Sequence, residues 1–264
     1  MQGSSAQLRI MGGGFIPDEN GTNPDALIQN KVAPPAIIKD CAECPEMVVI
    51  PAGSFVMGST KNAEEQPPYA VTVRIFLMGK TEVTQKQWTD VMGSNPSRFL
   101  KCGENCPIDN VEWKDINQFI AKLNQKTGQK YRLPSETEWE YAARAGTTSE
   151  WSFGNDVSRV GNYAWYEGNS GNKTQSVAQK LPNAFGLFDM HGNVWELTED
   201  CFHENYAGAP TDGSAWTTGC ADNRRVLRGG SWFNITANLR SAVRNWDFPV
   251  NRYNSFGFRL ARDL

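Results

Sequence analysis

YRLPSETEWEYAARAG (residues 131–146) is the stretch that decides most about the fold. Ser135 followed three residues later by Glu138 is a capping box, the pattern that begins a helix. Gly146 is a typical helix stop, so the spacing predicts a helix over 135–145. Trp139, Ala142 and Ala143 form the stripe that such a helix would bury. Its acidic residues are expected on a solvated face; they are Glu136, Glu138 and Glu140.

Two further helices are predicted on the N-terminal side of this stretch. Thr84 with Gln87 forms a second capping box, and Gly93 ends that helix. Residues 113–126 have an apolar face with helical spacing, formed by Ile116, Phe119, Ile120 and Leu123.

Short strands separate these helices, and loops follow them. Residues 47–59, MVVIPAGSFVMGS, predict a pair of short strands, and alternation over 71–77 predicts one more strand. After Gly146 the chain is rich in Gly, Asn and Trp and shows no long helical period. Helices early and loop-dominated strands late indicate an α+β fold.

Length and charge limit the possible architectures and partners. The chain has 264 residues and a net charge of −3, with no basic stripe, which argues against a nucleic-acid partner. No apolar run approaches the roughly 20 residues that span a bilayer, so no transmembrane segment is expected. Residues 1–40 have turn and linker composition and are expected to be an extended or partly disordered arm. Residues 41–264 are expected to form one domain.

Six cysteines fall into three sequential pairs, which are Cys41 with Cys44, Cys102 with Cys106, and Cys201 with Cys220. Three disulfides are the favoured interpretation, and a zinc site built from the CxxC-like spacings is the alternative. Disulfides would indicate an oxidising compartment, the periplasm or cell surface, reached after a signal segment is removed. A cytoplasmic location is the alternative.

Several segments together resemble the formylglycine-generating enzyme (sulfatase-modifying factor) family. They are MVVIPAGSFVMGS (47–59), KTEVTQKQW (80–88), YRLPSETEWEYAARAG (131–146), NAFGLFDMHGNVWEL (183–197), RVLRGGSW (225–232) and GFRLAR (257–262). The resemblance implies an irregular C-type-lectin-like fold. In that fold two or three helices surround a small twisted antiparallel sheet with long loops.

The same resemblance implies structural calcium. The first set of ligand positions is Asp189, Gly192, Val194 and Glu196, and a second, weaker set is Asn162, Tyr163, Asn169 and Gly171. Carboxylate and backbone oxygens are the ligands that Ca²⁺ prefers. The alternative is that Asp189 and Glu196 only cap turns. The two histidines, His191 and His203, are expected to be surface or packing residues.

The family's oxidases bind copper through two cysteines that follow the RGGS motif. The positions that align with those cysteines here are Asn234 and Leu239, and neither side chain is a thiolate. We therefore expect no copper and no formylglycine formation by the family's mechanism. Family members without the cysteines in periplasmic peptide or siderophore maturation suggest an oxidoreductase as one alternative function.

Residues 233–256 alternate between residues typical of a scaffold and freely variable ones. This texture resembles the variable proteins of diversity-generating retroelements, which suggests a non-catalytic surface for a protein ligand on a cell or phage. Trp246 is expected to belong to the scaffold, and a plain structural or interaction domain is the remaining alternative. The predicted ligand-binding residues are Phe233, Asn234, Ile235, Val243, Asn245, Asp247, Phe248, Val250, Asn251, Tyr253, Asn254, Ser255 and Phe256.

Overall fold

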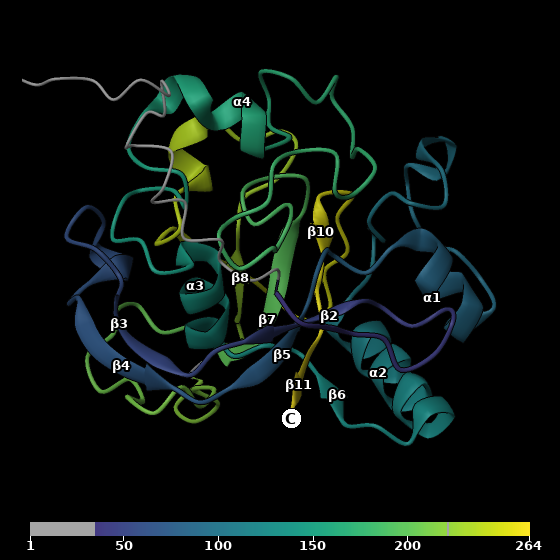
Figure 1. Ribbon diagram of the computed structural model, residues 1–264, viewed down its shortest axis with the longest axis horizontal. Coiled ribbons are helices and arrows are strands. Elements are labelled where there is room, and N and C mark those ends of the chain that lie inside the picture. Colours follow the sequence, from purple (N-terminus) through teal and green to yellow (C-terminus); the bar gives the residue numbers. More distant parts are fainter. Residues whose placement is uncertain (1–34, 221) are drawn as a thin grey trace, which may run out of the picture. The chain divides into compact units, whose positions relative to one another are not determined.

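The computed structural model describes residues 35–220 and 222–264, and Figure 1 shows their arrangement. The α-helices are α1 (Gln85–Met92), α2 (Trp113–Thr127), α3 (Glu136–Arg144) and α4 (Val160–Tyr163). The 3-10 turns are η2 (Ala63–Glu65), η3 (Leu100–Cys102), η4 (Val157–Arg159) and η5 (Thr236–Leu239). None of the helices in these residues is long and apolar enough to cross a membrane.

The strands form two sheets and a separate hairpin. The strands are β1 (Ile37–Ile38), β2 (Met47–Ile50), β3 (Gly53–Met57), β4 (Tyr69–Val73), β5 (Phe76–Gly79), β6 (Tyr131–Arg132), β7 (Trp195–Cys201), β8 (Arg225–Arg228), β9 (Arg244–Asp247), β10 (Phe256–Gly257) and β11 (Ala261–Asp263). One sheet has the order β1-β2-β5-β11-β6, the other has the order β10-β7-β8-β9, and β3 pairs with β4. The mixture of segregated helices and mainly antiparallel sheets confirms the α+β class.

The three predicted helices are confirmed, together with their local capping signals. Thr84 accepts a hydrogen bond from the backbone N–H of Gln87, and Ser135 accepts one from that of Glu138. The apolar face predicted for α2 is buried. α3 ends one residue earlier than predicted, because Ala145 takes the left-handed conformation, with φ of 46°, that the sequence suggested for Gly146.

The single strand predicted over 71–77 is wrong. β4 ends at Val73 and pairs only with β3, whereas β5 begins at Phe76 and pairs with β2 and β11. The chain therefore passes from the hairpin to the five-stranded sheet between Arg74 and Ile75. Burial alternates in β4, whereas Arg74 and Ile75 are both exposed and all four residues of β5 are buried.

The solvated acidic face predicted for α3 is also wrong. Glu136, Glu138 and Glu140 are all buried, although a charge of this kind is rarely buried without a partner. Glu140 pairs with Arg144 and Arg228, and Glu136 pairs with Arg244. Glu138 pairs with Arg132, so arginines from β6, β8, β9 and the last turn of α3 compensate the charges that the helix brings inward.

Five arginines of the C-terminal region pair with carboxylates far away in the sequence. Besides the two arginines on β8 and β9, Arg240 pairs with Glu65, Arg252 with Glu112, and Arg259 with Glu196. The Arg240 and Arg259 pairs are buried, so removing one partner of either would leave a buried charge without its counterion.

The folded unit begins earlier than the predicted boundary at residue 41. Ile37 and Ile38 pair with Val48 and Met47, so β1 is an edge strand of the five-stranded sheet. Most of the predicted N-terminal arm, residues 1–34, lies outside the described residues.

The three predicted disulfides are confirmed, and no cysteine is free. Zinc ligation by these residues is therefore excluded in this state of the chain, because each sulfur already bonds to its neighbour. Cys201–Cys220 ties the loop that follows β7, while the other two bridges close short turns.

We expect Arg228→Met to lower the free energy of unfolding by about 3–5 kcal/mol, because it removes one of the two arginines that compensate the buried Glu140. Arg252→Met is the matched control, since the Arg252 side chain is 39% exposed and its ion pairs are worth about 1 kcal/mol or less. Urea unfolding of both variants measures the difference. Equal losses would show that burial of the Arg228 pair is not what matters.

Candidate functional site

The exposed apolar side chains of the described residues gather toward the C-terminal end of the sequence. Of the thirteen large hydrophobic residues that are exposed, six lie between residues 233 and 253. We call these six the C-terminal patch; they are Phe233, Ile235, Trp246, Phe248, Val250 and Tyr253. Monomeric proteins seldom leave so many large apolar side chains in solvent along one short segment without a partner.

The patch has two parts, joined by backbone and side-chain contacts. Phe233 and Ile235 precede η5, whose Leu239 packs against residues of α4. The other four follow or lie on β9, the edge strand of the four-stranded sheet. The indole N–H of Trp232 donates to the carbonyl of Asn254 at 3.1 Å and links the two parts.

The loop from β9 to β10 is fixed to the start of α2 through its backbone. The N–H of Trp113 donates to the carbonyl of Pro249 at 3.1 Å, and that of Asn110 donates to the carbonyl of Tyr253 at 2.9 Å. These bonds do not depend on the side chains that the loop presents to solvent. The backbone of the loop is thus held in place without using its outward apolar side chains.

Three of the predicted ligand-binding residues do not belong to the surface. Val243 and Phe256 are buried in the main hydrophobic core, and Ser255 is buried with its carbonyl accepting from the N–H of Trp195 at 2.7 Å. They lie at the points where the segment enters and leaves the core. Trp246, predicted as scaffold, is instead 37% exposed and lies under the guanidinium of Arg224 at 4.2 Å.

The remaining predicted residues are polar and lie among the patch side chains. Asn245 is exposed, while Asp247, Asn251, Asn254 and Asn234 are half-buried. Asn251 donates to Asp247, and the side-chain oxygen of Asn234 accepts from the N–H of Ser231 at 3.0 Å. Short polar groups between large apolar ones give the segment the composition of an adaptable binding surface.

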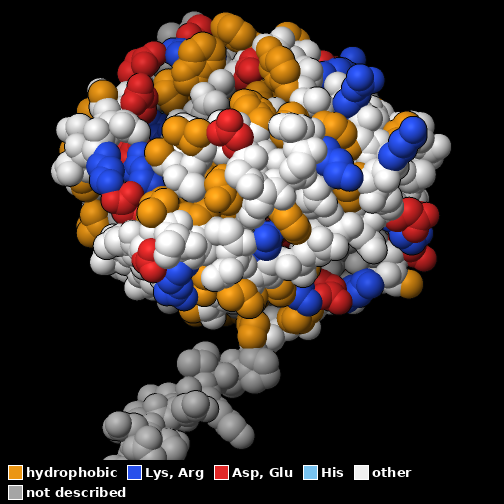
Figure 2. Space-filling view, turned by 90° about the horizontal axis from the view of Figure 1, so that it is seen from above, with side chains coloured by type: hydrophobic (Ala, Val, Ile, Leu, Met, Phe, Trp, Pro, Cys, Tyr) orange, Lys and Arg blue, Asp and Glu red, His pale blue; other side chains and the backbone are white. Residues whose placement is uncertain are grey.

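Figure 2 shows the face of the molecule toward which α4 lies in Figure 1. Its centre is largely uncharged, with apolar side chains among uncharged polar ones, and charged side chains are more frequent at its rim. This is the usual layout of a protein-binding surface, in which charges are depleted from the centre.

The two positions that align with the family's copper cysteines, Asn234 and Leu239, have different surroundings. Leu239 is fully buried in a small cluster with Trp151, Val160 and Ala164. The Asn234 side chain is engaged by Ser231. Since all six cysteines are in disulfides, the chain offers no thiolate at this location.

In the first predicted set of calcium ligands, the two carboxylates, Glu196 and Asp189, have different hydrogen-bond partners. Both oxygens of Glu196 accept from Arg259, at 2.6 and 2.7 Å, and one also accepts from the indole of Trp139. One Asp189 oxygen accepts from the N–H of Ala178 at 2.8 Å, whereas the other is buried with no hydrogen-bond partner. Asp189 is thus the member of the set with a free oxygen.

A third carboxylate, which sequence reasoning missed, lies in the same buried region. Glu82 accepts from the side chain of Asn193 at 3.0 Å and from the N–H of Val194 at 3.2 Å. Burial holds the pKa of Glu82 well above its usual range, and the negative charges of Asp189 and Glu196 raise it further. Burial likewise raises the pKa of Asp189 to about 6. The only signal for Glu82 in the sequence was its position in the segment KTEVTQKQW (80–88).

The second predicted calcium set is used for local loop closure. The Asn169 side chain accepts from the N–H of Tyr166 at 2.9 Å and donates to the carbonyl of Ala164 at 2.9 Å. Tyr163 stacks on Phe153, and the carbonyl of Asn162 accepts from Leu181. Gly171 has a positive φ of 65°. Within the described residues, no three His, Cys, Asp or Glu side chains group as a metal site.

His191 joins three loops next to the position of the family's second cysteine. Its Nδ1 lies 2.7 Å from the carbonyl of Leu239, and its Nε2 lies 2.9 Å from the hydroxyl of Ser152. The backbone N–H of Ser152 also donates to Nε2, at 3.2 Å. Nε2 therefore accepts and Nδ1 donates, which requires the neutral ring.

We expect His191 to make folding sensitive to acid. Burial lowers its pKa from the ordinary 6.5 to about 4, so its stabilising contribution is complete above pH 6.5 and is lost as the pH falls toward 4. Wild type should lose about 2–3 kcal/mol more than His191→Gln between pH 7 and 4.5. Urea unfolding at both values measures this, and identical pH dependences would contradict the assignment.

Comparisons with known proteins agree with this geometry. The profile of the sulfatase-modifying factor enzyme 1-like domain matches residues 34–264. PvdO from Pseudomonas aeruginosa is 35% identical, with a TM-score of 0.80 over 88% of this chain and 99% of its own. Treponema denticola variable protein 1 is 30% identical, with a TM-score of 0.76 over 87% of this chain and 99% of its own. Chaperone protein LppX of Paenibacillus barcinonensis is 30% identical over 71% of this chain and 78% of its own. The chain belongs to the sulfatase-modifying factor enzyme 1-like family.

Proposed function

We propose that this family member is a non-catalytic binding protein whose C-terminal patch contacts a protein ligand. The observation that carries the proposal is the concentration of exposed apolar side chains on one segment whose backbone is anchored from behind. Aromatic side chains provide large contact area at low entropic cost, and Asn and Asp between them adapt their hydrogen bonds to a partner.

The segment also has the properties that diversification requires. Two stretches of exposed and half-buried residues, 233–238 and 245–254, flank a buried run at 239–244, and Ser255 and Phe256 are buried where the segment ends. The exposed and half-exposed residue types are those that adenine substitution in AAY codons can produce, except for Trp246. The likeness to a Treponema denticola variable protein supports a retroelement-diversified surface. The three disulfides support a location outside the cytoplasm, in the periplasm or at the cell surface.

We expect the outward side chains to be exchangeable without loss of stability. Serine at Phe233, Ile235, Phe248 and Tyr253 should change the free energy of unfolding by about 0.5 kcal/mol or less per site, as is usual for exposed positions. Phe256→Ala, the buried control from the same segment, should cost about 3–5 kcal/mol. Urea unfolding of the variants tests this.

Large losses at the outward sites would show that they hold the fold together and would contradict the proposal. The genomic counterpart is a near-repeat of the codons for residues 233–256 that differs at adenines, close to a reverse-transcriptase gene. A locus with neither feature would remove the diversification from the proposal and leave a fixed binding surface.

We also propose a structural Ca²⁺ at the first predicted set. Three buried carboxyl groups, Glu82, Asp189 and Glu196, lie near one buried arginine, Arg259, and Lys180 is also close to Asp189. One oxygen of Asp189 is buried without a hydrogen-bond partner among the described residues. A divalent cation would offset this excess of negative charge. Because Glu196 is engaged by Arg259, Asp189 would be the main carboxylate ligand, with the carbonyls of Gly192 and Val194 completing the set.

Calcium should therefore raise thermal stability, and a chelator should lower it. At free calcium 100-fold above its dissociation constant, the gain is about 2.7 kcal/mol. Asp189→Asn should abolish the response, whereas Asp212→Asn, an exposed carboxylate held by Ser214, should leave it intact. Thermal unfolding with and without chelator measures this, and a response that survives Asp189→Asn would place the cation elsewhere.

A further inference from the structure

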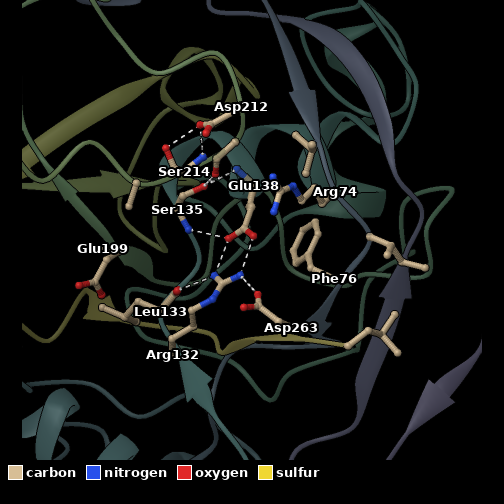
Figure 3. Close-up of a pocket in the computed structure, with 15 residues that line it drawn as sticks. Arg74, Phe76, Arg132, Leu133, Ser135, Glu138, Glu199, Asp212, Ser214 and Asp263 are labelled. Carbon is tan, nitrogen blue, oxygen red and sulfur yellow. Dashed lines mark hydrogen bonds and ion pairs between the residues drawn. The ribbon is translucent and has the colours of Figure 1, made fainter.

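A cavity of about 530 Å³ lies at the end of the molecule opposite α4, near β6 and the end of β11 (Figures 1 and 3). Its apolar walls come from Val73, Ile75, Phe76, Leu133 and Ala215. Its polar lining comes from β6, α3, β7 and the loop around Asp212. The volume falls within the range of roughly 300–1,000 Å³ typical of small-ligand sites.

Most of the charged groups in this cavity already have partners. Arg132 makes a bidentate pair with Glu138, at 2.6 and 2.7 Å, and reaches Asp263 at 2.6 Å. Asp212 accepts from the N–H and hydroxyl of Ser214 in its own turn. These groups form a closed polar floor with little capacity for a further charged ligand.

Two charged side chains of opposite sign remain. Among the described residues, the guanidinium of Arg74 and the carboxylate of Glu199 are the lining charges for which no hydrogen bond or ion pair is found. Arg74 is exposed and Glu199 is half-buried. Figure 3 shows them on opposite sides of the cavity, with the Arg132–Glu138 pair between them.

Glu199 is also incompletely compensated by its surroundings. Burial raises its pKa above the ordinary value, although Arg225 and Arg132 act in the opposite direction. Arg225 is directed elsewhere, since its guanidinium lies over the ring of Trp113 at 4.2 Å and donates to the carbonyl of Glu199 rather than to its carboxylate. A ligand ammonium would supply the missing charge at the carboxylate.

We infer that this cavity binds a short zwitterionic peptide with apolar side chains, its carboxylate on Arg74 and its ammonium on Glu199. Guanidinium groups pair well with carboxylates, and charge-assisted hydrogen bonds of both signs fix the direction of the ligand. The exposed side chain of Ile75 would contact the apolar side chain of the ligand. The site is separate from the C-terminal patch and does not depend on the function proposed for it.

The test titrates the full chain with leucine, Leu-Leu and Leu-Leu-Leu by isothermal calorimetry, and with the N-acetyl and C-terminal amide forms of Leu-Leu. We expect at least one free peptide to bind and each blocked dipeptide to bind about tenfold or more weakly, through loss of one charge-assisted contact. Glu199→Gln should erase the penalty of acetylation but keep that of amidation. Arg74→Gln should do the reverse.

Arg98→Gln is the matched control, because Arg98 is exposed and lies outside this cavity. It should leave all the affinities unchanged. Thermal unfolding identifies any variant that fails to fold. If either Glu199→Gln or Arg74→Gln does not fold, the remaining variant and the blocked dipeptides still test the assignment. No binding of any free peptide at millimolar concentration, equal binding of blocked and free forms, or loss without this charge selectivity would each overturn the assignment.

Discussion

The buried ion pairs between α3 and the arginines of β8 and β9 are the constraint on which the rest of the domain depends. Glu140 meets Arg228, and Glu136 meets Arg244, all of them at most 8% exposed. Each group is costly to bury alone, so only arrangements that bring both partners together are acceptable. A helix in the middle of the sequence thereby fixes two strands about a hundred residues later, and with them the start of the C-terminal patch.

This constraint explains how an irregular region can hold a surface without relying on that surface. The segment after β9 is held by backbone bonds to Trp113 and Asn110 and by the buried Ser255 and Phe256. Its outward side chains contribute little to these contacts. A scaffold of this kind separates stability from recognition, since a change in an outward side chain does not alter the bonds that position it. On the edge strand β9, the exposed Trp246 likewise lies between two polar residues, Asn245 and Asp247.

Local signals were readable from the sequence, whereas long-range ones were not. The caps at Thr84 and Ser135 act within four residues, so the pattern alone located α1 and α3. The burial of Glu136 and Glu140 depends on Arg244 and Arg228, which no helical periodicity can reveal. The alternation of apolar and polar residues over 71–77 did not reveal that this stretch contains two strands belonging to different sheets. Composition suggested a variable segment at 233–256 but could not show that Val243, Ser255 and Phe256 point into the core. The cavity at Arg74 and Glu199 joins elements too distant in sequence for any motif to mark.

The replacement of the family's two cysteine positions changes the role of this region rather than only removing a reaction. Leu239 is buried in an apolar cluster, and its carbonyl accepts a hydrogen bond from the ring of His191. The other ring nitrogen of His191 contacts Ser152, so this histidine connects η5 to the loop at Ser152. Asn234 closes the preceding turn on Ser231. A reactive site needs an open coordination position and an accessible thiolate, whereas these contacts fill the interior and stiffen the backbone. Phe233 and Ile235 are exposed on this turn, so the region where the family's oxidases hold a cofactor here supports part of the surface that we propose for ligand binding.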